Sequence, residues 1–385
     1  MLTKRTLRPV YVVGVGMHSY QRASNVPYTE LGLVAIRAAL RDCGVSWPVV
    51  ESAYIGTAQL GVAVGLPMLR HLGSTRPSVV HVENASASGA SAFRLAYLEV
   101  ASGVSDVSIA IGVDKPSNRP VGKDLSNTPD LVGELFPPAA HFALFAERYM
   151  RETGTNAEQL AQVAVKNHRN GLLNPNAQRR EETTLESVMS SAPIAGSLTK
   201  YQCCPVGEGA AAVIVASDPA IVTHQVNQDR AVRVAASVSH SEALYDSPDL
   251  VDQELTRDTT VRALAQAGVT PDDLDVVELH DAFAIEELAY IEAMGLSREG
   301  EAGRDLERGD FDIGGRCAVN PSGGLLSLGH PVGPTGLGQV AEITTQLRGE
   351  AGNRQHAHAR VGLAHMLGVG AVCVEHVLLA PEQKG

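Results

Sequence analysis

Two short segments place reactive side chains on tight, glycine-rich turns. The segment ENASASG, residues 83–89, puts Ser86 on a turn between an expected strand and an expected helix. The segment GHPVGPTG, residues 329–336, holds His330 between a glycine and a proline and also leads into a helix. An imidazole titrates near neutral pH, so a histidine fixed on a stiff turn suits a general base. Ser86 is the corresponding candidate for a nucleophile.

Two further histidines lie beside potential strands. His280 follows the apolar run DVVEL, at the carboxyl end of an expected strand, where the sites of α/β proteins gather. A neutral imidazole there could donate a hydrogen bond to a developing oxyanion, and a capping or core histidine is the alternative. His365 lies in AHMLGVG, before a glycine-rich turn, and could face the same cavity as His330.

The cysteines give no sign of a disulfide framework or a metal site. The sequence holds five of them, which are few, odd in number and scattered: Cys43, Cys203, Cys204, Cys317 and Cys373. Free buried cysteines usually contribute to packing, and none of the spacings indicates zinc. We therefore expect reduced thiols in a cytoplasmic protein, with no bound metal.

The elements that must position these residues follow an α/β pattern. The run VYVVGVGMHS, residues 10–19, is apolar and β-branched, which is typical of a strand buried on both faces. The next segment, residues 28–45, repeats apolar residues at helical spacing and reaches Gly44, a residue type that favours helix C-termini. A strand is expected to follow.

This unit recurs in the second part of the chain. Residues 37–56 line up with residues 262–281, and VRVAASVSHS precedes the second copy as VYVVGVGMHS precedes the first. In the second copy Thr270, followed by a proline and two aspartates, is a good helix start. The pattern predicts two duplicated α/β halves, residues 1–218 and 219–385. A polar excursion of about residues 115–195 is too long for a simple crossover.

Composition narrows the class of function. With 44% apolar residues, 19% charged residues and a net charge of −12, the sequence is typical of a tightly packed α/β protein. The acidic balance disfavours general binding to nucleic acid or to anionic membranes. No apolar run approaches the roughly 20 residues that a membrane-spanning helix needs.

The four segments and the duplicated half together resemble the thiolase superfamily, and most closely the sterol-carrier-protein-x type thiolases. The segments VKNHRNGLLNPNAQ and QCCPVGEGAAA are also similar to that branch, and the similarity runs nearly end to end. The resemblance implies a fold of two βαβαβαββ halves in a five-layered α/β/α/β/α sandwich. It also implies a homodimer or homotetramer.

The resemblance assigns a role to each reactive residue. Ser86 stands where the family has its nucleophilic cysteine. His280 matches the histidine of an oxyanion hole, and His330 matches the histidine that activates the nucleophile. His365 matches the histidine that this branch has where most thiolases carry a second, acid/base cysteine.

The resemblance also implies the substrate and partners. Family members cleave 3-oxoacyl-CoA or join two acyl groups, and this branch often handles branched or sterol-derived chains. Coenzyme A then enters as part of the substrate, with no tightly bound cofactor. Some relatives work with a small zinc-ribbon/OB-fold protein that helps bind acyl-CoA. The nearest cluster of cations for the CoA phosphates is Lys166, Arg169, Arg179 and Arg180.

Ser86 leaves three functions open, because an alcohol, unlike a thiol, has no appreciable ionised fraction at neutral pH. The first is acyl transfer through Ser86, activated by His330 or His365. The second is retro-aldol cleavage of a 3-hydroxyacyl-CoA, which needs a base and an oxyanion hole but no covalent nucleophile. The third is a non-catalytic acyl-CoA or lipid-binding partner subunit.

Overall fold

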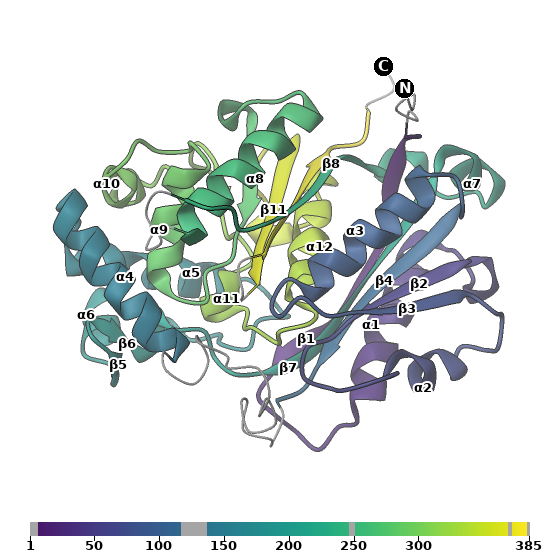
Figure 1. Cartoon of the computed structure of the whole chain (residues 1–385), viewed down its shortest axis with the longest axis horizontal. Coiled ribbons are helices and arrows are strands. Elements are labelled where there is room, and N and C mark those ends of the chain that lie inside the picture. Colours follow the sequence, from purple (N-terminus) through teal and green to yellow (C-terminus); the bar gives the residue numbers. More distant parts are fainter. Residues whose placement is uncertain (1–6, 117–136, 246–250, 369–371, 383–385) are drawn as a thin grey trace.

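The computed structural model describes residues 7–116, 137–245, 251–368 and 372–382. Ten strands of this part of the chain form one mixed sheet in the order β10-β9-β11-β12-β8-β1-β7-β4-β2-β3. Figure 1 shows the N-terminal and C-terminal ribbons side by side, with helices covering both. Among the described residues no helix is long and apolar enough to span a membrane.

The two halves have the same strand order and direction. In each half two neighbouring pairs are parallel and two are antiparallel, so β3-β2-β4-β7-β1 corresponds to β10-β9-β11-β12-β8. The strands of the first half are β1 Val10–Gln21, β2 Ser52–Gly56, β3 Ser78–Val82, β4 Val107–Asp114 and β7 Glu208–Ser217. Those of the second half are β8 Val232–Ser241, β9 Val276–Glu278, β10 Ala318–Val319, β11 Val361–Gly368 and β12 Val372–Leu379. The predicted duplication is confirmed.

Two central helices hold the halves together. Among the described residues the half-sheets are paired through Tyr11 with Arg233 and Val12 with Val232. Helices α3 (Ser88–Ala101) and α12 (Thr335–Leu347) pack against each other and against strands of both halves. Helix α1 (Tyr28–Cys43) covers the first half-sheet and α8 (Val251–Ala267) covers the second. This gives the predicted five layers.

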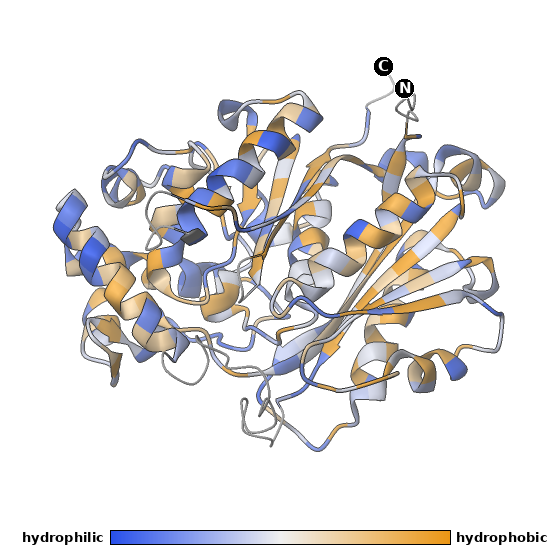
Figure 2. Cartoon of the chain, viewed as in Figure 1, coloured by the Kyte–Doolittle hydropathy of each residue, from blue (hydrophilic) through white to orange (hydrophobic). Residues whose placement is uncertain are grey.

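Glycines in β1 set the distance between the first sheet and its outer helix. A Cβ at Gly14 would lie 2.4 Å from the Ala39 carbonyl oxygen, and one at Gly16 would lie 2.3 Å from that of Ala35. Only a strand without side chains at these points lets α1 pack so closely. Helix α1 ends at Gly44, whose φ of 72° is the left-handed conformation expected there. Figure 2 shows many apolar residues in the strands of the sheet that the helices cover.

The excursion covers one end of the second half. Its helices α4 and α5 pack against α9, and α5 also contacts α10 and α11. Its elements are α4 Pro138–Thr153, α5 Ala157–Leu172, α6 Leu185–Met189, β5 Pro193–Ala195 and β6 Leu198–Thr199. The helices it contacts are α9 Ala284–Ala293, α10 Ala302–Glu307 and α11 Gly324–Ser327. Residues 117–136 of the predicted excursion lie outside the described residues.

The structure locates the predicted boundary between the halves and the helix start predicted at Thr270. The expected boundary between residues 218 and 219 falls at the start of α7 (Asp218–Thr223), which connects β7 to β8. The helix start expected at Thr270 is one turn of 3₁₀ helix, Pro271–Asp273. This turn is short because β9 begins only three residues later, so the capping residues serve a turn rather than a helix.

Candidate active site

Ser86 lies on a strained turn between β3 and α3. Ala85, just before it, has a φ of 48°, a left-handed conformation that is costly for a residue with a Cβ. Ser88 stabilises the turn, because its hydroxyl donates to the Ala85 carbonyl oxygen (2.6 Å) and accepts from the Asn84 N–H (2.9 Å). The turn places the buried Ser86 hydroxyl at the N-terminus of α3.

The Ser86 hydroxyl faces His330. Ser86 Oγ lies 3.0 Å from His330 Nε2, and His330 Nδ1 lies 2.9 Å from Thr335 Oγ1. The Thr335 hydroxyl has one proton, which it donates to the Pro331 carbonyl oxygen at 2.6 Å. Thr335 therefore accepts from Nδ1–H, which leaves His330 Nε2 unprotonated. In this tautomer Ser86 donates to Nε2, as a nucleophile does to its base.

Burial keeps His330 neutral. It lowers the pKa of His330 well below its ordinary value of 6.5, and the nearby His280 lowers it further. The partner on Nδ1 is a neutral hydroxyl, so no negative charge there offsets the cost of burying an imidazolium. The residue is therefore ready to accept a proton at neutral pH.

His280 lies on the loop between β9 and α9, close to His330. The two rings are nearly perpendicular, at 86°, and their centroids are 5.4 Å apart. His280 Nδ1 is 2.8 Å from Glu286 Oε1, and its buried Nε2 has no hydrogen-bond partner among the described residues. Ser86, His330 and His280 thus form one site at the seam between the two halves.

His365 does not present a free nitrogen to this site. Its Nδ1 accepts the backbone N–H of His280 at 3.3 Å, and its Nε2 lies 3.0 Å from Thr256 Oγ1. Met366, on the other face of β11, is the residue that packs with Ala87 beside the nucleophile turn. Burial, with His280 nearby, lowers the pKa of His365 to about 3. The structure therefore places His365 behind His280 as a support, and not in the cavity with His330 as expected.

The His330 turn, which belongs to the second half, is anchored to the first half. In the first half, the Asp114 carboxylate at the end of β4 accepts the Gly333 N–H at 2.7 Å. Close approach to α3 is possible because Gly89 has no side chain, since a Cβ there would lie 2.4 Å from the Gly333 carbonyl oxygen. Asp114 was not expected at the site from sequence, although it ends a strand at its carboxyl edge, where such sites gather.

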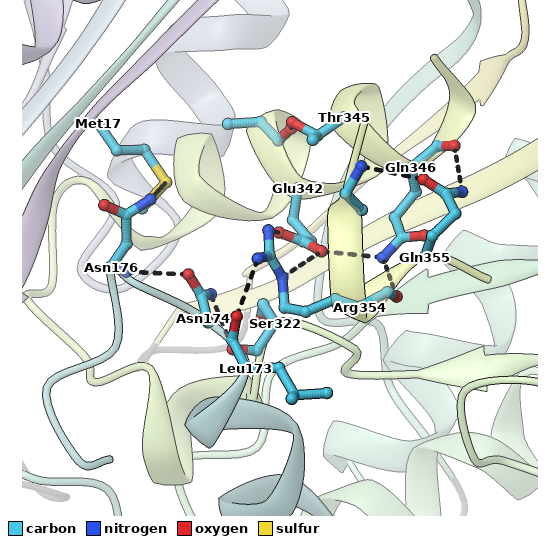
Figure 3. Close-up of polar contacts among 12 residues, drawn as sticks. Met17, Leu173, Asn174, Asn176, Ser322, Glu342, Thr345, Gln346, Arg354 and Gln355 are labelled. Carbon is cyan, nitrogen blue, oxygen red and sulfur yellow. Dashed lines mark hydrogen bonds and ion pairs between the residues drawn. The ribbon is translucent and has the colours of Figure 1, made fainter. Parts of the chain in front are cut away.

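The loop that precedes the His330 turn is fixed by a polar network. Asn174, after α5, donates to the Ser322 carbonyl oxygen at 2.9 Å, and Figure 3 shows this contact beside an ion pair of Arg354 and Glu342. Glu278 holds Ser322 from the other side, accepting its N–H at 2.8 Å and its hydroxyl at 2.7 Å. These contacts make the segment leading to His330 rigid.

One member of the predicted cation cluster, Lys166, lies in the protein interior. Lys166 is buried, with Nζ 3.0 Å from Glu287 Oε1 and 2.7 Å from Asn167 Oδ1, so the prediction that it binds CoA phosphates is wrong. Helical periodicity turns this lysine inward, where an internal carboxylate compensates its charge. Arg169 is exposed and pairs with Asp312.

The other two arginines lie further along the excursion. Arg179 donates to the carbonyl oxygens of Cys203 (2.9 Å) and Leu326 (3.1 Å), so its charge braces the backbone. Arg180 is exposed and reaches only the Leu172 carbonyl oxygen, at 3.5 Å. For Arg169, Arg179 and Arg180 a CoA contact stays a prediction.

A surface cavity of about 510 Å³ lies next to both histidine-bearing turns. It is lined in part by Arg22, Arg179, Lys200, Tyr201 and Cys204. The Cys204 N–H donates to the Ala282 carbonyl oxygen (2.8 Å) on the His280 turn, and the Gln178 N–H donates to the Leu328 carbonyl oxygen (3.0 Å) before His330. Of the cations named here, Arg179 belongs to the cluster predicted from the sequence, whereas Arg22 and Lys200 do not.

One group of potential metal ligands is present among the described residues. The ligand atoms of His365, Cys373 and Glu375 lie within 4.8 Å of one another and are fully buried. Burial raises the pKa of Glu375 to about 8 and raises that of Cys373 well above its ordinary value. Burial thus favours the protonated forms of both side chains.

Comparison with protein families covers nearly the whole chain. Residues 10–219 match the family model described as "Thiolase, N-terminal domain" and residues 236–380 match "Thiolase C-terminal domain-like". Human sterol carrier protein 2 is 35% identical over 96% of this chain and 71% of that protein. The benzoylsuccinyl-CoA thiolase subunit BbsB of Thauera aromatica is 35% identical over 94% and 95%, respectively.

Solved structures share the fold at lower identity. The Ltp2-ChsH2(DUF35) aldolase superimposes with a TM-score of 0.84 at 23% identity, covering 98% of this chain and 100% of that one. Human mitochondrial 3-ketoacyl-CoA thiolase superimposes with a TM-score of 0.76 at 20% identity, covering 98% and 100%. At these identities the likeness is one of fold.

Proposed function

Because the chain belongs to the thiolase family, we propose that it is an acyltransferase that makes or breaks a carbon–carbon bond in an acyl-CoA thioester. Ser86 carries the acyl group in place of the family's nucleophilic cysteine. The observation that carries this proposal is the 3.0 Å contact between Ser86 Oγ and His330 Nε2. It supplies what an alcohol lacks, namely a base that removes the proton during attack.

In the degradative direction, the Ser86 oxygen attacks the 3-oxo carbon of a 3-oxoacyl-CoA while its proton passes to His330 Nε2. The bond between C2 and C3 then breaks, the C2 carbanion takes up the proton that His330 Nε2 received from Ser86, and an acyl ester of Ser86 remains. The thiol of a second CoA takes the acyl group from this ester. The reverse sequence joins two acyl groups.

We place the CoA moiety in the cavity beside Cys204. Arg22 and Lys200 line it and offer positive charge to the phosphates in an otherwise acidic chain. One relative is named as a sterol carrier protein and another as a benzoylsuccinyl-CoA thiolase subunit, so lipid and aromatic acyl groups are the two classes to screen. A cytoplasmic location stays a prediction.

The chain is also proposed to act as an oligomer with a partner. One relative is named as a thiolase subunit, and one structural neighbour pairs Ltp2 with ChsH2(DUF35). These names support a partner protein, which the sequence resemblance expects to be a small zinc-ribbon/OB-fold protein. The homodimer or homotetramer rests on the sequence resemblance alone. Co-purification and the mass of the native particle test both.

Retro-aldol cleavage of a 3-hydroxyacyl-CoA is the second candidate. It is favoured by the unpartnered Nε2 of His280, which can remove a hydroxyl proton without a covalent intermediate. Release of an aldehyde or ketone, unchanged in a Ser86→Ala variant, would establish it in place of acyl transfer. Binding of acyl-CoA without turnover, alone or with a partner, would instead indicate the non-catalytic function.

A direct test exchanges the nucleophile. We expect mass spectrometry to find an acyl group on Ser86 after incubation with 3-oxoacyl-CoA, and Ser86→Ala to abolish it. Ser86→Cys should raise thiolysis strongly, because the remaining groups are in place and a thiol is the better nucleophile. Ser102→Cys, which adds an exposed thiol at the end of the same helix, is the matched control. No acylation together with unchanged turnover in Ser86→Ala would refute acyl transfer.

A further inference from the structure

We propose that Glu286 is a positioning residue that fixes His280 as a proton acceptor, so that His280 is the second acid and base of the site. This goes against the oxyanion-donor role expected for a neutral His280, and it moves to His280 the acid/base role expected of His365. The chemistry assigned to His280 rests on the proposed acyl transfer, whereas the position of its proton does not.

The surroundings of Glu286 make it a hydrogen-bond acceptor. It is fully buried, and three donors reach its carboxylate. Oε1 accepts from His280 Nδ1 at 2.8 Å and from the Tyr290 hydroxyl at 3.1 Å, and Oε2 accepts the Phe283 N–H at 2.8 Å. With the Tyr290 hydroxyl donating to one oxygen and the Phe283 N–H to the other, the Glu286 carboxylate acts as an acceptor toward His280 Nδ1 as well.

An accepting carboxylate decides which nitrogen of His280 carries the proton. Nδ1 must be protonated, since it has only an acceptor opposite it. A neutral His280 therefore has a bare Nε2, which cannot donate to an oxyanion. This Nε2 is buried and without a partner among the described residues, and its ring faces that of His330. The free lone pair thus lies in the site.

His365 completes the arrangement by holding the backbone. It accepts the His280 N–H through Nδ1, while its Nε2 is bonded to Thr256. With both nitrogens engaged it exchanges no proton with a substrate. His280 has one nitrogen engaged and one free, which is the condition for proton transfer.

The balance of protons in the second half of the reaction follows. The CoA thiol gives its proton to His280 Nε2 as its sulfur bonds to the acyl carbon, and the imidazolium that forms is paired with Glu286. The bond between the acyl carbon and Ser86 Oγ breaks. The proton on His280 then returns to the Ser86 oxygen, so both histidines end neutral and no further reactant is required.

The position of the proton can be measured without substrate. Nitrogen-15 NMR of the histidine-labelled full chain, with His280 assigned by its loss in His280→Gln, should show Nδ1 protonated and Nε2 bare. Glu286→Gln, whose amide can donate to Nδ1, should move the proton to Nε2. Glu292→Gln is the matched control, because this carboxylate of the same helix binds Tyr149 and the Ala302 N–H. A protonated Nε2 in the neutral unaltered chain would overturn the proposal.

Activity gives the second readout. Glu286→Gln should lower kcat for thiolysis about 10²–10⁴-fold, the range for loss of general acid–base catalysis, with KM nearly unchanged. Glu292→Gln should stay within about threefold of the unaltered enzyme, since its carboxylate lies outside the proton path. A Glu286→Gln variant as active as Glu292→Gln would refute the role of Glu286. If the unaltered chain turns over no acyl-CoA, acyl transfer fails while the NMR result still decides the proton position.

Discussion

His330 and His280 are neighbours with the same side chain and different partners. Both are buried and their rings face each other, but Nδ1 of His330 donates to a hydroxyl and Nδ1 of His280 donates to a carboxylate. Each tautomer leaves Nε2 bare. The difference lies in the charged form, because a carboxylate stabilises an imidazolium and a hydroxyl does not.

This comparison separates two tasks that one histidine cannot perform equally well. A base that starts each cycle must be neutral, and burial beside the Thr335 hydroxyl keeps His330 so. A group that holds a proton between two steps needs its charge compensated, and Glu286 does this for His280. Substitutions of Thr335, the partner of His330, and of Glu286, the partner of His280, should therefore affect different steps of the reaction.

The largest effect is expected at His330 itself. In His330→Gln no imidazole accepts the Ser86 proton, so acylation of Ser86 should slow about 10²–10⁴-fold. Quenched-flow mass spectrometry of the acyl-enzyme measures this rate. His71→Gln, an exposed histidine outside the site, is the control and should leave the rate unchanged. Equal rates in the two variants would contradict the role of His330 as base.

A smaller effect is expected at the hydroxyl that orients His330. Thr335→Val removes the acceptor for Nδ1–H with little change of shape, so one hydrogen bond of about 1 to 1.5 kcal/mol is lost. If that bond acts fully in the transition state, acylation slows about tenfold. Thr345→Val is the matched control, because its hydroxyl, on the same helix, donates only to the Ala341 carbonyl oxygen. An unchanged rate in Thr335→Val would show that the turn alone orients the ring.

The smallest effect is expected from pH in the unaltered chain. The pKa of His330 is held well below 6.5 by burial and by His280, so its neutral, active form persists as pH falls through 6.5. Acylation of Ser86 should therefore stay on its plateau from about pH 8 to about pH 6 and decline only below that. Single-turnover acylation across this range tests it. An inflection at or above pH 6.5 would mean that His330 is more exposed, or that its imidazolium form is more stable, than the structure indicates.

Much of the fold could be predicted from the sequence because it depends on local patterns. The apolar run of β1 and the periodic helix ending at Gly44 are local signals, and repetition of the same unit indicated two halves. Ser86 and His330 were also predictable, since each lies on a turn of small residues and glycines whose geometry the sequence restricts.

The remaining parts of the site depend on distant partners. The sequence predicts a surface cation at Lys166, but its side chain meets Glu287, more than a hundred residues away in sequence. The sequence predicts that His365 faces the cavity, but its partners come from α8 and from the His280 backbone. The sequence does not single out Glu286, although it lies only six residues after His280. The helical run AIEELA does not indicate which of its carboxylates faces the site.

The turns that carry Ser86 and His330 occupy equivalent positions in the repeat, each leading into the central helix of its half. Each half therefore supplies one of the two side chains that face each other, Ser86 from the first and His330 from the second. The 3.0 Å contact between Ser86 Oγ and His330 Nε2 exists only while the two halves are packed together, so a change that shifts one half against the other separates the pair without altering either residue.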